Sequence, residues 1–316
     1  MNRTSSSVFN RYHTPADLAD VSARQNLRTA VSHSFQTPFS FSSLVFSVQG
    51  NVSGGGSFLL EAQVCVAETW SDFYPLGYFS AAENKSFPLR EDAFGRLAVD
   101  ELILTRPAQA YRFRIQTAGQ AVWHKVSVCG IGETFDYKQT QAARLPAGFF
   151  MHRVEPISQK EYPSPDKNRI CSPTSLCMAL HALGAPVSLP QVIKGVYDPT
   201  ANIYGNWVIN TFYAAQQGLD AYVRRFSALT ELEEFCTEKS LVIASVAYEK
   251  QALPGAPQPQ TPGHLVLIRG WQNGKILVAD PAAPTAAEVL RSYDAQAFAR
   301  AWLKNKQGAA YIVRKP

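Results

Sequence analysis

The stretch "NRICSPTSLCMALHALG" (residues 168–184) decides how the second half of the chain folds. Pro173 suits the first turn of a helix, where its missing N–H costs nothing, and Gly184 is a natural stop. Leucines between them recur at helical spacing, as on a face that packs on a core. The pattern predicts a helix over residues 172–183 with Cys171 at its beginning. Free N–H groups and the helix dipole favour a thiolate there.

A nucleophilic thiol needs a base, and the base needs a group that orients it. His264 begins a predicted strand directly after the Pro/Gly-rich loop "LPGAPQPQTPG", so it can face a cleft. Asp280 ends the next predicted strand, and Pro281 prevents regular pairing beyond it. These two side chains are the candidates for base and orienter.

The turn between the two strands, within "WQNGK", tests that pairing. A two-residue turn would place His264 and Asp280 on opposite faces of the hairpin. A three-residue turn over residues 272–274 pairs residue 266 with residue 280 and places both side chains on one face. Their Cβ atoms are then about 7 Å apart, within side-chain reach. The chemistry therefore predicts the three-residue turn.

Cleavage of an amide also needs donors for the oxyanion that forms. The N–H of Cys171 is one such donor. Gln159, in "EPISQKEYPSP", is the candidate for the second, because it carries a neutral amide NH₂ and precedes the nucleophile by a turn-rich loop.

The segments "ISQKEY", "ICSPTSLCMALHALG", "GHLVLIRGW" and "KILVADPAA" resemble the papain-like cysteine peptidases that process bacteriocin leaders of the double-glycine type. The resemblance covers about residues 150–316 and is to the stand-alone bacterial branch. It implies a catalytic set of Cys171 as nucleophile, His264 as base, Asp280 as orienter and Gln159 in the oxyanion hole. It also implies a substrate-binding set of Asn206, Trp207 and Gly263.

One residue departs from the family pattern. Ser172 stands where the family usually has Gly after the cysteine. We interpret it as a tolerated variation that alters the backbone at the oxyanion site.

The first half of the chain has a different texture. Residues 1–35 are polar and carry one predicted short helix, over residues 15–28. Residues 36–133 show period-two alternation between Gly-, Asn- and Pro-containing turns, which predicts an antiparallel β-sandwich, jelly-roll-like. This part resembles the sandwich found ahead of some bacterial family members. Residues 134–167 are read as a linker and approach that carries Gln159.

Residues 168–316 form the predicted papain-like catalytic domain, and the protein is predicted to be α+β. Besides the helix after Cys171, the patterns predict helices around residues 207–217, 228–238 and 294–304. They predict strands at residues 241–248, 264–271, 275–280 and 309–314.

Composition narrows the classes of protein. The chain has 316 residues, of which 46% are hydrophobic and 17% charged, which is typical of a folded soluble protein. The formal net charge is only +5, without basic runs that interleave aromatics, so nucleic-acid binding is not expected. No apolar stretch predicts a membrane span, and the N-terminus has no signal-peptide core. The compartment is left open between the cytoplasm and export by a non-standard route.

The five cysteines are an odd number, so one at least is unpaired within the chain. Cys65 and Cys129 lie in strand-like sequence and are read as buried free thiols rather than as a pair. Cys177 and His181 share the predicted helix with Cys171, but paired Cys-x-x-Cys spacing is absent, so no metal is expected.

The sequence thus predicts a cysteine peptidase that hydrolyses peptide or amide bonds through a thioester, with a peptide or protein substrate and no cofactor. One alternative is an amidase or acyltransferase acting on cell-wall peptides. Another is a catalytically silent module whose β-domain binds a glycan or a protein. Three aromatic residues of that domain could stack on sugars but are read as sandwich packing: Trp70, Tyr74 and Tyr78.

Overall fold

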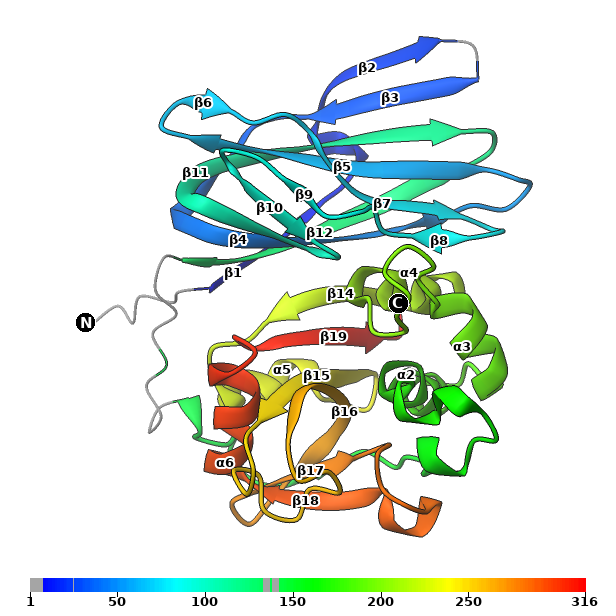
Figure 1. Cartoon of the computed structure of the whole chain (residues 1–316), viewed down its shortest axis with the longest axis vertical. Coiled ribbons are helices and arrows are strands. Elements are labelled where there is room, and N and C mark those ends of the chain that lie inside the picture. Colours follow the sequence, from blue (N-terminus) through cyan, green and yellow to red (C-terminus); the bar gives the residue numbers. More distant parts are fainter. Residues whose placement is uncertain (1–7, 25, 133–136, 138–141) are drawn as a thin grey trace.

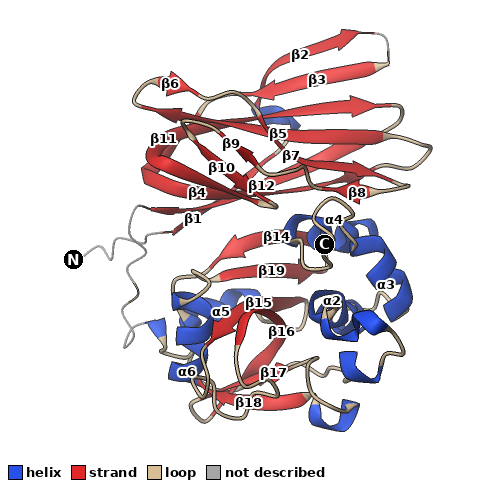
Figure 2. Ribbon diagram, in the orientation of Figure 1, coloured by secondary structure: helices blue, strands red, loops and turns tan. Residues whose placement is uncertain are grey.

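A computed structural model describes residues 8–24, 26–132, 137 and 142–316. It consists of an N-terminal β-rich region packed on a mixed region of helices and sheet (Figure 1). Among the described residues, the α-helices belong to the second region, where Figure 2 labels them. The predicted α+β class, with an antiparallel β-domain ahead of a region that mixes helices and sheet, is confirmed. Part of the predicted linker, residues 134–136 and 138–141, lies outside the described residues.

Within the described residues, the N-terminal region is one sheet of 12 strands with the central order β1-β12-β4-β11-β5-β7-β8. Its strands are β1 (Val8–His13), β2 (Leu18–Arg24), β3 (Leu27–Ser32), β4 (Phe35–Asn51), β5 (Ser57–Val66), β6 (Thr69–Trp70), β7 (Tyr74–Ser80), β8 (Asn84–Lys85), β9 (Arg90–Glu91), β10 (Gly95–Ala98), β11 (Glu101–Ala118) and β12 (Val122–Gly132). The long strands β4 and β11 pair antiparallel with register shifts, which mark bulges that bend a sheet.

The helix predicted over residues 15–28 is wrong. Of its described residues, only Pro15–Asp17 is helical, as a single 3₁₀ turn. Leu18–Arg24 and Leu27–Ser32 pair as the strands β2 and β3, and β3 also pairs with the second half of β11. β1 likewise pairs with β12. Pairing with β11, roughly 90 residues further along the chain, overrides the local helical pattern.

The second sheet has seven strands in the described residues, with the central order β14-β19-β15-β16-β17-β18. Its strands are β13 (Phe150–Met151), β14 (Asp220–Arg225), β15 (Ser240–Tyr248), β16 (Thr261–Gln272), β17 (Lys275–Ala279), β18 (Leu290–Asp294) and β19 (Ala309–Arg314). The helices are α2 (Cys171–Ala182), α3 (Leu189–Val196), α4 (Trp207–Gln216), α5 (Leu232–Phe235) and α6 (Ala295–Ala299), which continues as a π-helical turn to Lys304.

The main elements expected in this region are present. The helix predicted at 228–238 is shorter, a 3₁₀ turn (Leu229–Glu231) followed by α5, whereas α6 and its π-helical turn together match the helix predicted at 294–304. The structure adds elements that the sequence patterns did not indicate: α3, β13, β14 and β18. No helix in the described part of the chain is both long and apolar enough to cross a membrane.

Helix α2 is buried along most of its length, from Ser172 to Leu180. It packs across β16, where the Ser175 hydroxyl donates to the carbonyl of Leu265 at 3.0 Å. A helix that is covered on several sides carries small and apolar residues all round rather than on one stripe. This placement brings its first residue, Cys171, beside the beginning of β16.

The β16–β17 hairpin corrects the predicted turn. The turn has two residues, Asn273 and Gly274, both with positive φ (50° and 75°), and Gln272 pairs with Lys275. A one-residue register shift follows, between the pairs Gly270–Leu277 and Ile268–Val278. The offset that the chemistry required is therefore present, but a bulge within β16 supplies it instead of a longer turn.

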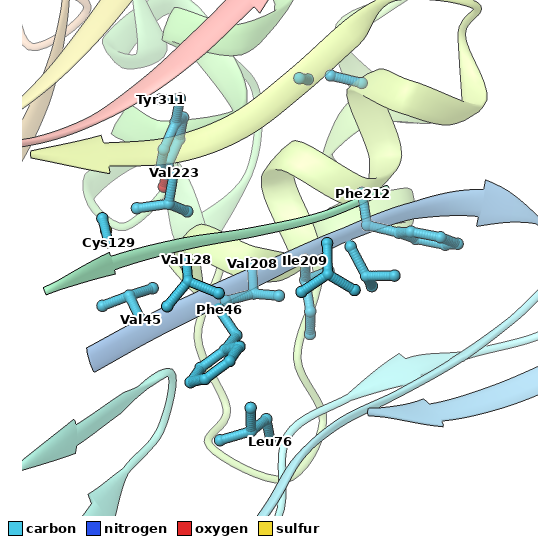
Figure 3. Packing of buried hydrophobic residues seen from close by; sticks show 14 of the residues in the cluster. Val45, Phe46, Leu76, Val128, Cys129, Val208, Ile209, Phe212, Val223 and Tyr311 are labelled. Carbon is cyan, nitrogen blue, oxygen red and sulfur yellow. The ribbon is translucent and has the colours of Figure 1, made fainter. Parts of the chain in front are cut away.

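The two regions share one hydrophobic cluster (Figure 3). Phe212 of α4 packs its ring against Phe58 and Phe79 of the N-terminal sheet, with ring centroids 5.5 and 4.7 Å apart. Val208 and Ile209 of the same helix belong to the same cluster. Helix α4 is thus one of the elements that join the two regions, together with β14.

Candidate active site

The structure brings Cys171, His264 and Asp280 together. Cys171 is the first residue of α2 and is partly exposed. His264 lies on β16 and Asp280 directly follows β17, and each is only 1% exposed. His264 Nε2 lies 2.7 Å from Asp280 Oδ1. Because Nε2 is engaged by the carboxylate, Nδ1 is the ring nitrogen left to face the thiol.

The carboxylate of Asp280 is held on both oxygens. Oδ1 also accepts the backbone N–H of Ala282 at 3.0 Å, and Oδ2 accepts the hydroxyl of Tyr293 at 2.7 Å. Tyr293 is 1% exposed and lies on β18. Sequence reasoning missed this residue, because β18 itself was not predicted. The structure pairs Tyr293 with Ile276 on β17, the strand that Asp280 directly follows.

The electrostatics of the site favour a thiolate beside a charged imidazole. Burial alone raises the pKa of Cys171, but the hydrogen bond and charge of His264 outweigh it and lower that pKa below its usual range. Burial opposes the charge of His264, yet Asp280 and Cys171 raise its pKa to about 10. Despite burial, the imidazole holds the pKa of Asp280 below its ordinary value.

The other buried thiols behave differently. Burial raises the pKa of Cys129 to about 11 and the pKa values of Cys177 and Cys236 to about 12. The expected free thiols are confirmed, since all five cysteines are unpaired, although Cys65 is only partly buried. Cys177 Sγ lies 3.6 Å from His181 Nε2 inside α2, and the described residues contain no cluster suited to a metal ion. Cys171 therefore differs from the three buried thiols in having a lowered pKa, which its contact with His264 causes.

Gln159 is fully buried beside this group, in a 3₁₀ turn (Gln159–Glu161). Its backbone N–H donates to the carbonyl of Pro281, the residue after Asp280, at 2.9 Å. Its side-chain Nε2 donates to the carbonyl of Lys167 at 2.8 Å, and its Oε1 has no partner. One of the two Nε2 hydrogens is therefore committed to the protein.

The structure gives a reason for a serine at position 172, which the sequence did not reveal. Its side chain is fully buried, and its hydroxyl lies 2.8 Å from Asn210 Oδ1 and 2.9 Å from the hydroxyl of Tyr311. A glycine at this position would leave both partners without that contact. The serine thus ties the beginning of α2 to α4 and β19.

The residues expected to contact substrate lie in different settings. Asn206 is 2% exposed, and its Oδ1 caps α4 by accepting the N–H groups of Val208 and Ile209, both at 3.1 Å. Trp207 is partly exposed, and the guanidinium of Arg225 lies 5.8 Å from its ring.

Gly263 is exposed at the beginning of β16, where a Cβ would find only Lys306 Nζ, at 3.8 Å. Asn206 therefore uses its side chain inside the protein, whereas Trp207 and Gly263 remain open to a ligand.

The aromatic residues of the N-terminal region were read as packing, and Tyr74 is fully buried. Trp70 and Tyr78 are partly exposed, with Arg112 and Lys85 over their rings at 4.7 and 5.5 Å. The interior packing read from the sequence thus holds in full only for Tyr74.

A papain-like fold with a lowered thiol pKa beside an imidazole and a carboxylate defines the class: a cysteine-type peptidase. The chain belongs to the Peptidase_C39 like family, whose model matches residues 151–310, about half of the chain. The resemblance read from the sequence is confirmed at the level of the family. No curated protein matched the chain.

Three solved structures are similar to part of the chain. A double glycine motif protease from an AMS/PCAT transporter, in complex with the leader peptide, is 18% identical, covers 54% of this chain and 97% of its own, and has a TM-score of 0.37. The peptidase domain of Streptococcus ComA, a bi-functional ABC transporter of a quorum sensing pathway, is 14% identical, with coverages of 52% and 99% and a TM-score of 0.37. A C39-like peptidase from Bacillus anthracis is 15% identical, with coverages of 54% and 98% and a TM-score of 0.40.

Proposed function

We propose that this protein hydrolyses peptide or amide bonds through a triad of Cys171, His264 and Asp280. The observation that carries the proposal is the buried 2.7 Å contact between His264 Nε2 and Asp280, which leaves Nδ1 for the thiol. The lowered pKa of Cys171 and the raised pKa of His264 support a thiolate–imidazolium pair as the resting state. Such a pair presents a nucleophile and an acid together.

In the first half of the reaction, the thiolate of Cys171 attacks the carbonyl carbon, and the carbonyl π electrons move to oxygen. The N–H of Cys171, free at the start of α2, and the second Nε2 hydrogen of Gln159 would hold this oxyanion. When the intermediate collapses, the C–N bond breaks, and the imidazolium of His264 gives its proton to the leaving amine. A thioester remains on Cys171.

In the second half, neutral His264 takes a proton from water, and the hydroxyl attacks the thioester carbon. Collapse of this intermediate releases a carboxylic acid and returns the thiolate beside the imidazolium. Asp280 keeps Nε2 engaged throughout, so Nδ1 stays directed at the reacting atoms.

The test replaces the sulfur in the full chain. We expect Cys171→Ala to abolish hydrolysis in a screen against a peptide library, with an unchanged melting temperature. Cys177→Ala is the matched control on the same helix and should retain activity if it folds. Residual hydrolysis by Cys171→Ala at the wild-type rate would reject the mechanism.

The same site chemistry is compatible with transfer of the acyl group to an amine other than water. Adding amine nucleophiles to the peptide screen separates the two outcomes, because a transferase yields the amide product whereas a hydrolase yields the free acid. The predicted glycan contact of the N-terminal region stays a separate prediction.

A further inference from the structure

The N-terminal region reaches the N-terminal end of α4 through a carboxylate. Asp100 lies in the turn between β10 and β11, and its Oδ2 accepts the backbone N–H of Trp207 at 2.5 Å. Trp207 is the first residue of α4, so this N–H has no acceptor within the helix. The N-terminal region therefore supplies a cap to a helix of the peptidase region.

Asp198 links the N-terminal region to the same end of α4. Asp198 is fully buried, and its Oδ1 accepts the backbone N–H of Ser86, in the N-terminal region, at 3.2 Å. Its Oδ2 accepts Nδ2 of Asn206, the N-cap residue of α4, at 2.8 Å. The hydroxyl of Thr200 donates to the carbonyl of Ser86 at 2.8 Å. The beginning of α4 is thus fixed from the N-terminal region at two points.

One turn further along α4, Asn210 connects this end to the nucleophile. Its Nδ2 donates to the carbonyls of Asn206 and Tyr204 at 2.7 and 2.9 Å. Its Oδ1 accepts the hydroxyl of Ser172 at 2.8 Å. Ser172 directly follows Cys171, and both Ser172 and Asn210 are fully buried. A continuous series of hydrogen bonds therefore runs from the N-terminal region to the residue beside the nucleophile.

We propose that the N-terminal region positions the nucleophile, with Asp100 acting as a positioning residue through the Asn206–Trp207 peptide group, Asn210 and Ser172. The proposal rests on the proposed function only in taking Cys171 as the nucleophile. It assigns the N-terminal region a part in the catalytic unit.

Helix α4 uses Asp100 as the hydrogen-bond acceptor for the N–H of Trp207 and does not depend on the negative charge of Asp100. Burial raises the pKa of Asp100 to about 7, and the N–H of Trp207 opposes this rise. The carboxyl therefore ionises reluctantly there, whereas a neutral carbonyl oxygen at the same position can accept the same N–H. An asparagine should consequently replace Asp100 without loss.

The experiment measures the rate at which iodoacetamide at pH 7 alkylates Cys171 in the full chain, followed by peptide mass mapping. We expect Asp100→Ala and Ser172→Ala each to slow this alkylation by about threefold to tenfold. Because both changes break one series of contacts, the double variant should be no slower than the slower single variant.

Two controls separate positioning from general docking. Asp100→Asn should keep the wild-type rate. Gln49→Ala removes another contact between the regions, to Asp220 Oδ1 and the carbonyl of Ala221, away from the N-terminal end of α4, and should also keep that rate.

The proposal would be overturned if Asp100→Ala were alkylated at the wild-type rate, or if the rate losses of the two single variants multiplied in the double variant. It would also be overturned if Gln49→Ala slowed alkylation as much as Asp100→Ala does. If Asp100→Ala does not fold, Asp100→Glu displaces the acceptor by one methylene and should slow alkylation in its place. Hydrolysis by the wild-type chain is measured in parallel, because its absence with rapid alkylation of Cys171 would count against the proposed function alone.

Discussion

The lowered pKa of Cys171 comes from its neighbour His264. A thiol this close to a packed core would ordinarily be protonated, as burial makes Cys177 and Cys236. His264 reverses that preference for Cys171, because a charged imidazole stabilises the thiolate. Asp280 supports the imidazolium in turn.

Removing the imidazole should therefore turn the lowered pKa of Cys171 into a raised one. In His264→Ala only burial and weaker contacts remain, so we expect the pH midpoint of iodoacetamide alkylation to rise by more than about one unit. The measurement is the alkylation rate of Cys171 between pH 5 and pH 10. An unchanged midpoint would show that the helix terminus alone sets the thiolate.

Tyr293 is expected to matter through Asp280. Tyr293→Phe deletes the 2.7 Å hydrogen bond to Oδ2, and because hydrogen bonds to charged groups are strong, we expect kcat/KM to fall by about tenfold. The hydroxyl helps to hold the pKa of Asp280 low, so its loss should move the acid limb of the pH–rate profile to higher pH.

The matched control for this prediction is Tyr248→Phe. The hydroxyl of Tyr248 donates to the carbonyl of Gln258 and not to Asp280, so the acid limb should stay in place. A Tyr293→Phe enzyme that lost rate with an unmoved pH profile would indicate a purely structural role.

Among the elements, the β16–β17 hairpin decides whether the site can assemble. The bulge within β16 places His264 and Asp280 within contact, although the two-residue turn alone would separate them. Gly270 makes the bulge possible: its φ is 150°, and a Cβ there would lie 1.9 Å from the carbonyl oxygen of Phe150. The strand β13 (Phe150–Met151) therefore closes on a backbone that only glycine permits.

Gly270→Ala should destabilise the fold and disturb the site together. We expect a loss of about 2–4 kcal/mol in the free energy of unfolding, measured by urea denaturation, because β13 must move away. Gly274→Ala is the control: its φ is 75° but a Cβ there meets open space, so the cost should be about 1 kcal/mol. Equal costs at the two positions would contradict this account of the bulge.

At the scale of the whole molecule, the two regions share a core. The cluster that contains α2 and α4 also contains the interior of the N-terminal sheet, as Figure 3 shows for Phe46 and Phe212. Hydrogen bonds such as that from Asn10 Nδ2 to the carbonyl of Arg225 add polar contacts at the same boundary. Domains that share buried apolar surface of this kind unfold together.

Thermal unfolding should accordingly show one transition. Phe212→Ala removes a ring from the shared cluster, and Phe235→Ala removes one from the second cluster, where it packs against Phe226. We expect each to cost about 3–5 kcal/mol and to lower one common melting temperature by calorimetry. Independent folding of the regions would instead give two separate transitions, with Phe235→Ala lowering the melting temperature of the peptidase region only.

The sequence by itself determined the local features. The Pro173 and Gly184 signals located α2 to within a residue or two. The strand patterns identified the long strands β4, β5, β11 and β12 of the first sheet and β15, β16, β17 and β19 of the second. The chemistry of a thiol, an imidazole and a carboxylate in order along the chain also named the three residues that the structure brings together. Each of these signals lies within a few neighbouring residues, which is where helix capping and strand alternation operate.

Only the tertiary structure decided the long-range features. Four features depend on contacts that no local sequence pattern indicates. They are the pairing of the β2–β3 hairpin with β11, the bulge at Gly270, the contact of Tyr293 with Asp280 and the links from Asp100 to Ser172. Their physical reason is packing: a buried polar group must find a partner wherever the fold places one, and an edge strand pairs with whichever strand is exposed. Neither choice is encoded in a short stretch of sequence.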